Sequence, residues 1–325
     1  MRAVVCREFG PHDLLRIEDW PEPEPGPGEV QVAVAAVGVN YVDMLMCAGG
    51  YQLKPDLPFV PGLEAAGTVR KLGPGVTGVA VGDRVISAHR PGAFAEYAVC
   101  GADKLWPVPE AFDFAEAATF RSAFHTAYHA LAQRARLQAG ETLLVHGASG
   151  GTGLAAVQIG KVMGARVIAT GGSDDKLAEV ARLGADDVVN YTKGPLRDAV
   201  KALTGGKGVD VVFDPVGGDV FDESMRCLRW GARVCVIGFT SGRRPEAKVN
   251  HVLIKGASIL GIRAGEATRH DPSLLEDSRR TLLGWVAEGK LRPHISHRFT
   301  LDQVHEALQT VADRKVLGKA VMTVG

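Results

Sequence analysis

The fold of this chain is decided by the stretch His146-Gly147-Ala148-Ser149-Gly150-Gly151-Thr152-Gly153-Leu154. It lies between the apolar run 142–146, which predicts a strand, and residues 153–163, which predict a helix. The small residues follow the pattern Ala148-x-Gly150-x-x-Gly153, which allows a tight turn, a close approach of the backbone to a pyrophosphate, and packing of the helix on the strand. Because a helix N-terminus offers free N–H groups and a partial positive charge, we expect this turn to bind the phosphates of a dinucleotide.

Strand-like and helix-like segments alternate around this turn. Such alternation is typical of βαβ units and predicts an α/β domain with a doubly wound parallel sheet. The predicted strands are 142–146, 166–170, 187–189, 209–214 and 232–238, and the predicted helices are 153–163, 176–183 and 196–203.

The first hundred residues have a different pattern. The proline-rich segment 20–28 excludes a helix or a central strand, and turn signals separate the predicted strands 2–6, 29–39, 67–72 and 83–86. Helical material is expected from Phe114 to Leu131. The C-terminal part predicts helices at 274–288 and 304–313 and a closing strand at 319–323. The chain therefore combines a compact β-rich part with a βαβ part.

The amino-acid composition narrows the classes of function that the chain can have. The 325 residues include 37 Lys and Arg against 37 Asp and Glu, so the charge balance argues against nucleic acid as the main partner. With 46% apolar residues the chain buries a full core, yet no apolar run approaches the ~20 residues of a membrane span. The five cysteines form no C-x-x-C pair, which favours reduced thiols and a cytoplasmic location.

The end of the second predicted βαβ strand indicates which dinucleotide is bound. An acidic residue about 20 positions after the glycine pattern normally binds the ribose 2′-hydroxyl of NAD. Here Thr170-Gly171-Gly172 occupies that place, and Lys176 follows as a counter-charge for a phosphate. Asp174 and Asp175 are interpreted as N-cap residues of the next helix. The sequence therefore predicts NADPH rather than NADH.

These features, with Gly38-Val39-Asn40-Tyr41-Val42-Asp43 and Pro61-Gly62-Leu63-Glu64-Ala65-Ala66-Gly67, resemble the medium-chain dehydrogenase/reductase superfamily, and within it the zinc-free, zeta-crystallin-like quinone oxidoreductases. The resemblance covers essentially the whole chain. It implies a GroES-like β domain from residues 1–121 and 259–325, with a Rossmann domain at 122–258 inserted between them. It also implies a homodimer formed through the sheet edge at 257–262.

Two positions separate the chain from zinc-dependent relatives. These carry a metal-binding cysteine near position 40 and a histidine where this chain has Leu63, whereas Asn40 stands at the first position. A catalytic zinc needs about three protein ligands, so no metal is expected. The pair His125 and His129, four residues apart, is interpreted as packing or surface residues rather than as a ligand pair.

The resemblance assigns site residues one by one. Lys176 and Tyr191 match positions that hold the adenosine 2′-phosphate and its ribose, and Asn40, Tyr41 and Tyr51 match residues at the substrate mouth. The latter three are the candidate catalytic residues. Tyr51 has a second interpretation, as a loop aromatic packed on the β domain. The remaining predicted cofactor-binding residues are Thr126, Ala148, Ser149, Gly150, Gly151, Thr152, Gly153, Gly171, Gly238, Phe239, Thr240 and Lys315.

The expected function is hydride transfer from NADPH to a quinone or an α,β-unsaturated carbonyl. Without a zinc Lewis acid, such acceptors are favoured over alcohols because their own carbonyl delocalises the developing charge. One alternative is an enoyl-thioester reductase, whose acyl-CoA phosphate would meet Arg243, Arg244, Lys248, Arg263 and Arg269, although these residues are equally compatible with a solvated surface. Another alternative is a non-enzymatic NADPH- or RNA-binding protein.

Overall fold

A computed structural model describes residues 1–325, which form two compact units. Unit 1 comprises Met1–Ser122 and Arg292–Gly325, and unit 2 comprises Ala123–Leu291. The second boundary therefore falls at residue 292, later than the expected position 259. The reason is that strand β13 (Ser258–Gly261) extends the sheet of unit 2, while helix α9 (Ser273–Ala287) is hydrogen-bonded to Tyr128 and Gln133 of that unit.

The sheet of unit 2 has six parallel strands in the order β10-β9-β8-β11-β12-β13. Numbered from the first strand in the sequence, this is the order 3-2-1-4-5-6 of a doubly wound dinucleotide-binding fold. The predicted parallel sheet is confirmed. Besides β13, the strands are β8 (Thr142–Val145), β9 (Arg166–Gly171), β10 (Asp187–Asn190), β11 (Val209–Asp214) and β12 (Leu228–Val236).

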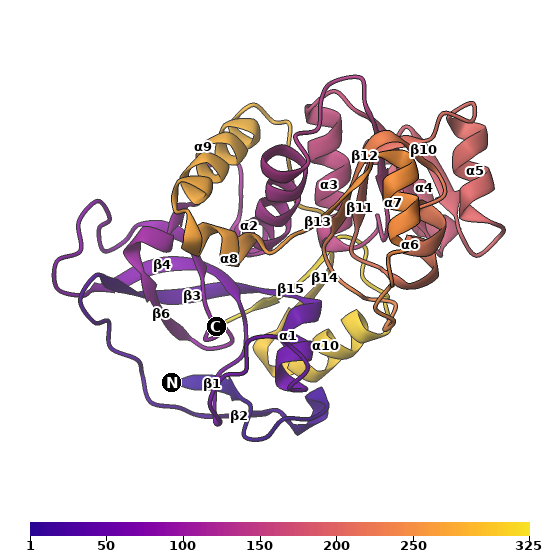
Figure 1. The fold of residues 1–325 in the computed structure, drawn as a ribbon. Coiled ribbons are helices and arrows are strands. Elements are labelled where there is room, and N and C mark those ends of the chain that lie inside the picture. Colours follow the sequence, from indigo (N-terminus) through magenta and orange to yellow (C-terminus); the bar gives the residue numbers. More distant parts are fainter. The chain divides into compact units, whose positions relative to one another are not determined.

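The helices of unit 2 connect these strands and cover both faces of the sheet. In Figure 1, α3 lies on one side of the strands and α6 and α7 lie on the other, as right-handed crossovers require when the strand order reverses at β8. Besides α9, the helices are α3 (Gly151–Val162), α4 (Asp174–Arg182), α5 (Leu196–Leu203), α6 (Gly218–Ser224), α7 (Val249–Lys255) and α8 (Ala264–His270). Helix α2 (Phe114–Tyr128) continues as a π-helical turn at His129–Arg134.

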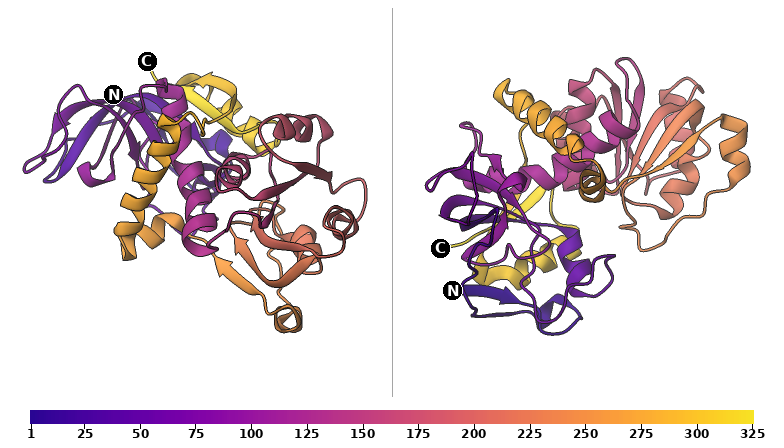
Figure 2. Two further views of the ribbon diagram at one scale, coloured as in Figure 1. Left: turned by 90° about the horizontal axis from the view of Figure 1, so that it is seen from above. Right: turned by 60° about the vertical axis from the view of Figure 1, so that its left-hand side comes forward.

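Unit 1 contains a seven-stranded sheet in the order β14-β15-β3-β4-β5-β7, with β6 also paired to β3. The C-terminal strand β15 pairs with β3, which belongs to the N-terminal part of the chain, so both parts of the sequence build this unit (Figure 2). The strands are β3 (Glu29–Val39), β4 (Glu64–Leu72), β5 (Arg84–Ala88), β6 (Tyr97–Gly101), β7 (Trp106–Pro107), β14 (Ile295–Thr300) and β15 (Lys319–Thr323).

Smaller elements complete unit 1. Strands β1 (Arg2–Val5) and β2 (Arg16–Asp19) form a separate antiparallel pair. Helix α1 (Tyr41–Cys47), which the sequence pattern did not predict, follows β3 directly, and α10 (Val304–Ala312) precedes β15. Short 3-10 turns lie at His12–Leu14, Ala102–Lys104 and Leu301–Gln303.

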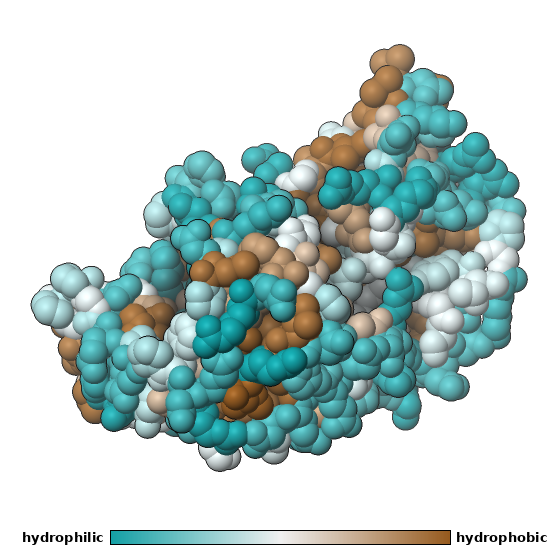
Figure 3. All heavy atoms as spheres, turned by 90° about the horizontal axis from the view of Figure 1, so that it is seen from below, coloured by the Kyte–Doolittle hydropathy of each residue, from teal (hydrophilic) through white to brown (hydrophobic).

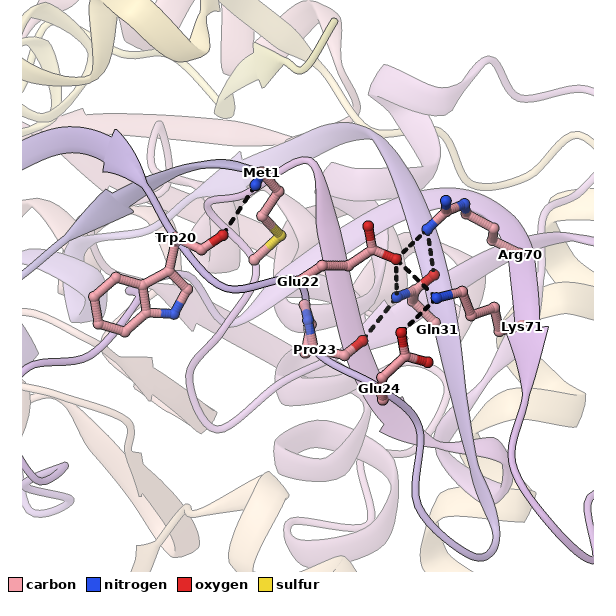
Figure 4. A network of polar contacts seen from close by, with 8 residues as sticks. All are labelled: Met1, Trp20, Glu22, Pro23, Glu24, Gln31, Arg70 and Lys71. Atoms are coloured by element: carbon pink, nitrogen blue, oxygen red, sulfur yellow. Dashed lines mark hydrogen bonds and ion pairs between the residues drawn. The ribbon is translucent and has the colours of Figure 1, made fainter.

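The proline-rich loop is anchored to the sheet of unit 1 by a polar network around Glu22 (Figure 4). The Glu22 carboxylate accepts hydrogen bonds from Gln31 on β3 at 3.1 Å and from Lys71 on β4 at 2.9 Å, and it forms an ion pair with Arg70. These donors, Lys71 first, lower the pKa of Glu22 to about 2. Prolines exclude this segment from the ladder, and the side chains of its glutamates fix it instead.

All five cysteines are buried and unpaired. Burial raises the pKa of each thiol, most strongly for Cys47. No helix of the structure has the length and apolar character that crossing a membrane requires.

Candidate functional site

The predicted glycine turn joins β8 to α3 in unit 2. Gly150 is the N-cap residue of α3, and its N–H donates to the carbonyl of Gly147 at 2.9 Å. A side chain at Gly153 is excluded, since a Cβ there would lie 2.3 Å from the Gly147 carbonyl oxygen. The turn therefore folds back tightly on itself and brings the N-terminus of a twelve-residue helix to the end of the sheet.

These residues fit the phosphates of a dinucleotide. A Cβ built at Gly150 would meet only the Gly147 carbonyl, at 3.3 Å, so the backbone here can be approached by a ligand. The N–H groups of the first turn of α3, at Gly151, Thr152 and Gly153, have no carbonyl partner within the helix and are available to phosphate oxygens.

The residues predicted to hold the adenosine end lie together at the neighbouring strand ends. Gly171 at the end of β9 pairs with Asn190 at the end of β10, and its carbonyl accepts the N–H of Tyr191 at 3.2 Å. A Cβ at Gly172 would lie 3.6 Å from the Tyr191 ring. Lys176 is half-buried in the first turn of α4, and this burial lowers the pKa of its ammonium. Residues 171, 176 and 191 thus converge on one edge of the sheet.

The two aspartates that precede Lys176 do not cap α4, contrary to expectation. Ser173 is the N-cap residue, and its hydroxyl accepts the Lys176 N–H at 3.5 Å. Asp174 lies in the first turn, where it pairs with Lys193 and accepts a hydrogen bond from Asn190 at 2.7 Å. The Lys193 ammonium holds the pKa of Asp174 below its usual range. The charge of Asp174 is therefore compensated by Lys193.

The predicted Gly238-Phe239-Thr240 loop follows β12 at the same edge of the sheet. Both the N–H and the hydroxyl of Thr240 donate to the carbonyl of Pro215, which follows β11, at 3.1 Å. Phe239 is exposed. Carboxyl ends of parallel strands share one edge, so this loop and the residues after β8, β9 and β10 lie at the same edge of the sheet.

The other two predicted cofactor-binding residues lie elsewhere in the sequence. Thr126 is half-buried in α2 within unit 2. Lys315 follows α10 in unit 1, where its exposed ammonium pairs with Asp313 at 2.9 Å. It is not among the residues that unit 2 brings together.

Unit 1 contains a buried polar cluster formed by Asn40, Asp43, Glu64 and Lys319. The Lys319 ammonium lies 2.8 Å from Oε1 of Glu64 and 2.6 Å from Oδ1 of Asn40. The other Glu64 oxygen accepts the Ser122 N–H at 2.9 Å. Lys319 and Glu64 are nearly inaccessible, with side chains 6% and 2% exposed, so the pair is fully desolvated.

Asp43 completes the cluster from α1. Its Oδ2 accepts the Asn40 N–H at 2.8 Å, whereas its buried Oδ1 has no hydrogen-bond partner. Burial raises the pKa of Asp43 to about 7, against the opposing effects of the Asn40 N–H and the Lys319 charge. Gly38 allows the close packing here, because a Cβ on it would meet the Glu64 carboxylate at 2.5 Å.

The contacts of this cluster determine whether Asn40, one of the candidate catalytic residues, can donate a hydrogen bond to a substrate. The side-chain amide of Asn40 donates to Glu64 at 3.1 Å and to the Gly38 carbonyl at 3.3 Å, so both of its hydrogens have protein acceptors. Tyr41, the first residue of α1, is 38% exposed. Tyr51 is half-buried against the hydrophobic core of unit 1, as its packing interpretation expects. The amide of Asn40 is therefore engaged within the protein, and the roles of Tyr41 and Tyr51 stay predictions.

Sequence reasoning did not assign roles to Asp43, Glu64 or Lys319. Two signals were present in the sequence. Asp43 lies three residues after Asn40, the spacing of a capping box, and Lys319 is the charged residue of the otherwise apolar run Lys319-Ala320-Val321-Met322. A charge inside a buried strand requires a partner.

No three His, Cys, Asp or Glu residues of the chain come together in a way that could hold a metal ion. The rings of His125 and His129 lie 6.4 Å apart, and His129 is hydrogen-bonded to Gln133 at 2.7 Å. Several of the basic residues considered as partners of an acyl-CoA phosphate already form ion pairs with acidic side chains of the protein. Arg243 contacts Asp219 and Asp222, and Arg263 and Arg269 both contact Glu266.

Comparisons with known proteins agree with both units. Residues 26–110 match the family described as alcohol dehydrogenase GroES-like domain, and residues 151–278 match the family described as zinc-binding dehydrogenase. The chain is 41% identical over 325 residues to the quinone oxidoreductase-like protein 2 homolog of Nematostella vectensis, covering 99% of this chain and 88% of that protein.

Two solved structures are similar over the full length. A mycobacterial protein complexed with NADPH has a TM-score of 0.93 at 32% identity, covering 99% of this chain and 100% of the other. An enoyl reductase solved in its apo form has a TM-score of 0.90 at 28% identity, covering 100% of this chain and 99% of the other. The combination of a GroES-like and a Rossmann-like domain, expected from the sequence, is confirmed.

Proposed function

Since the chain belongs to the medium-chain dehydrogenase/reductase superfamily, in its group of zinc-free quinone oxidoreductases, we propose that it is an NADPH-dependent reductase of quinones and α,β-unsaturated carbonyls. The observation that carries the proposal is the set of residues gathered at the end of the parallel sheet. A tight glycine turn there is accompanied by Lys176 and by two glycines where an NAD-specific acid would stand. The likeness to a protein solved with NADPH supports the same cofactor.

The chain's own residues have separate tasks. The N–H groups at the start of α3 bind the pyrophosphate, and Lys176 and Tyr191 hold the 2′-phosphate and the ribose. Thr126 and the loop at 238–240 orient the nicotinamide. NADPH, when bound, supplies a hydride from its nicotinamide ring. Tyr41 and Tyr51 are the proposed donors to the oxygen of the acceptor, on which negative charge develops.

We propose that the reaction proceeds without zinc. Leucine at position 63 cannot bind a metal, and the amide of Asn40 is occupied by Glu64 and Lys319. A quinone or enone needs no metal to stabilise its anion, because conjugation spreads the charge over the acceptor itself. Hydrogen-bond donors at the acceptor oxygen are therefore enough for this reaction, and no metal is required.

A second candidate is reduction of enoyl thioesters, which the likeness to an enoyl reductase favours. Oxidation of NADPH with a panel of quinones and with crotonyl-CoA separates the two. The proposal predicts turnover with quinones or simple enones that exceeds turnover with crotonyl-CoA. Preference for crotonyl-CoA would transfer the assignment to the second candidate, and tight NADPH binding without oxidation by any acceptor would indicate a binding protein.

We further propose a homodimer formed through the edge strand β13. Hydrophobic side chains gather on the surface at the upper end of the view in Figure 3. Five exposed apolar side chains of unit 2 belong to β13 or to the segments that precede it, and one of them is Ile259 of β13, which is 36% exposed. An open strand edge beside exposed apolar side chains is typical of a surface that pairs with another chain. Besides Ile259, the exposed apolar side chains of this surface are Trp230, Val249, Leu253 and Ile254, with exposed fractions from 64% to 80%.

A further inference from the structure

A buried histidine lies directly beside the glycine turn. His146 follows β8 and precedes Gly147, and its side chain is fully inaccessible. Its Nδ1 lies 2.8 Å from the hydroxyl of Thr170 on β9, and its Nε2 lies 2.6 Å from the hydroxyl of Ser224 on α6. One imidazole thus bridges β9 and α6 directly before the turn.

The hydrogen bonds assign the tautomer of His146. The Ser224 hydroxyl donates its single hydrogen to the Val220 carbonyl at 2.7 Å. Because the Val220 carbonyl can only accept, we infer that this hydrogen points to it and that the hydroxyl accepts from the imidazole, so that Nε2 carries the proton. In the neutral ring Nδ1 is then the acceptor for the Thr170 hydroxyl. Burial lowers the pKa of His146, which keeps the ring neutral in this arrangement.

Backbone hydrogen bonds connect this His146 bridge to the glycine turn, which is expected to bind the cofactor. The carbonyl of Thr170 accepts the N–H of Ala148, the first small residue of the turn, at 3.0 Å. Thr170 also directly precedes Gly171 at the adenosine end. The backbone N–H of His146 donates to Phe213 on β11 at 3.0 Å. A movement of this imidazole would therefore displace the start of the turn, where the pyrophosphate is expected to bind.

We propose that His146, held between Thr170 and Ser224, is a positioning residue that fixes the glycine turn in its cofactor-binding conformation. The inference rests on the proposed function, since it assumes that the turn binds NADPH. His146 touches neither cofactor nor substrate in this role. It acts by keeping one conformation of the turn populated, so that binding of the pyrophosphate does not have to order the loop.

The chain contains a matched control for this arrangement. Ser278 on α9 is also fully buried, donates to the carbonyl four residues earlier at 2.8 Å, and accepts a side-chain N–H from Gln133. Ser224→Ala and Ser278→Ala therefore remove the same kind of hydrogen bond from two helices of unit 2. Only the first deprives His146 of its acceptor.

The test measures the dissociation constants of NADPH and of 2′-AMP by titration of the wild type, His146→Leu, Thr170→Val, Ser224→Ala and Ser278→Ala. We expect His146→Leu to weaken NADPH binding about tenfold, and the Thr170 and Ser224 variants to weaken it about three- to tenfold. Ser278→Ala should change the dissociation constant of NADPH by less than about twofold. Binding of 2′-AMP, which lacks the pyrophosphate, should change by less than about twofold in all of them. If the variants weakened binding of NADPH and of 2′-AMP equally, the substitutions would have destabilised unit 2 as a whole, and the inference would be overturned.

A second measurement does not depend on the cofactor. The ¹H–¹⁵N spectrum of histidine-labelled protein should show His146 as the neutral Nε2–H tautomer, and Ser224→Ala should alter that signal while Ser278→Ala leaves it unchanged. A His146 in the Nδ1–H tautomer would contradict the proposal. If the wild type itself bound no NADPH, the proposed function would fail, whereas unchanged NADPH binding in His146→Leu would refute only the positioning role.

Discussion

Lys319 Nζ lies 2.8 Å from Oε1 of Glu64 inside unit 1, although 255 positions separate the two residues in the sequence. The contact joins the closing strand β15 to the start of β4, and both side chains are withdrawn from solvent. Because Asn40 lies within the same hydrogen-bonded cluster, the pair also fixes the start of α1. The C-terminal strand thus supplies the charge that a buried carboxylate near the predicted substrate residues requires.

Lys319→Met should destabilise the protein by about 3 kcal/mol or more, because it leaves the Glu64 carboxylate buried without its cation. Urea unfolding measures the change. Adding Glu64→Gln should restore most of the loss, since the double variant lacks both charges of this ion pair. As a control, Arg2→Met removes the exposed pair with Asp302 and should change the free energy of unfolding by less than about 1 kcal/mol. Additive effects of the two buried substitutions would contradict the account.

Asp43→Asn should stabilise the protein relative to the wild type in a pH-dependent way. The folded-state pKa of Asp43, about 7, lies above its ordinary value of 3.8, so the folded state retains a proton that the unfolded state releases. The wild type therefore loses stability as pH rises between about 4 and 7, by an amount on the order of 3 kcal/mol, and the variant does not. Unfolding measured at about pH 5 and pH 8 tests this. A difference independent of pH would show that Asp43 is ionised in the folded protein.

Lys176→Ala should weaken NADPH binding about tenfold or more while changing NADH binding by less than about twofold, because only NADPH carries the 2′-phosphate. The control is Lys161→Ala, since Lys161 lies near the other end of α3 and pairs with Asp186. Fluorescence titration with both nucleotides gives the two affinities. Equal weakening of NADPH and NADH would remove Lys176 from the phosphate site.

Gly153→Ala should lower NADPH affinity more than about tenfold and reduce thermal stability, because its Cβ would lie 2.3 Å from the Gly147 carbonyl oxygen. Gly194→Ala is the matched control, since a Cβ there meets no atom within 4 Å. It should leave affinity unchanged within about twofold. A Gly153 variant that binds NADPH normally would show that the turn is not the phosphate site.

Sedimentation at micromolar concentration should give a dimer for the wild type and a monomer for Leu253→Glu, because a charge on the exposed apolar face of α7 opposes its burial against a second copy. Val188→Lys, on the opposite edge strand β10, should leave the dimer intact. A wild type that sediments as a monomer would refute the proposed assembly.

Much of unit 2 was predictable because its signals are local. The strands at 142–145, 166–171 and 209–214 and the helix at 196–203 were expected within a few residues, since apolar runs and glycine turns punctuate them directly. The length of β3 was likewise predicted in full. In contrast, helix α1 was missed, because it is only seven residues long and starts from a strand end.

The interior of the site depended on long-range contacts that no local pattern contains. The Lys319–Glu64 pair and the bridge from His146 to Ser224 join residues far apart in the sequence. For Asn40, sequence reasoning identified the residue but not its neighbours, which take up both hydrogens of its amide. A single side chain's chemistry follows from its type, whereas its availability depends on what the fold packs around it.

The most direct test of the central claim uses enzyme treated with a chelator, titrated with NADPH and NADH and then assayed with a quinone acceptor. The account predicts that NADPH binds at least about tenfold more tightly than NADH and that the chelated enzyme still oxidises NADPH at its full rate. Equal affinity for the two nucleotides, or activity that disappears on chelation and returns with zinc, would contradict it.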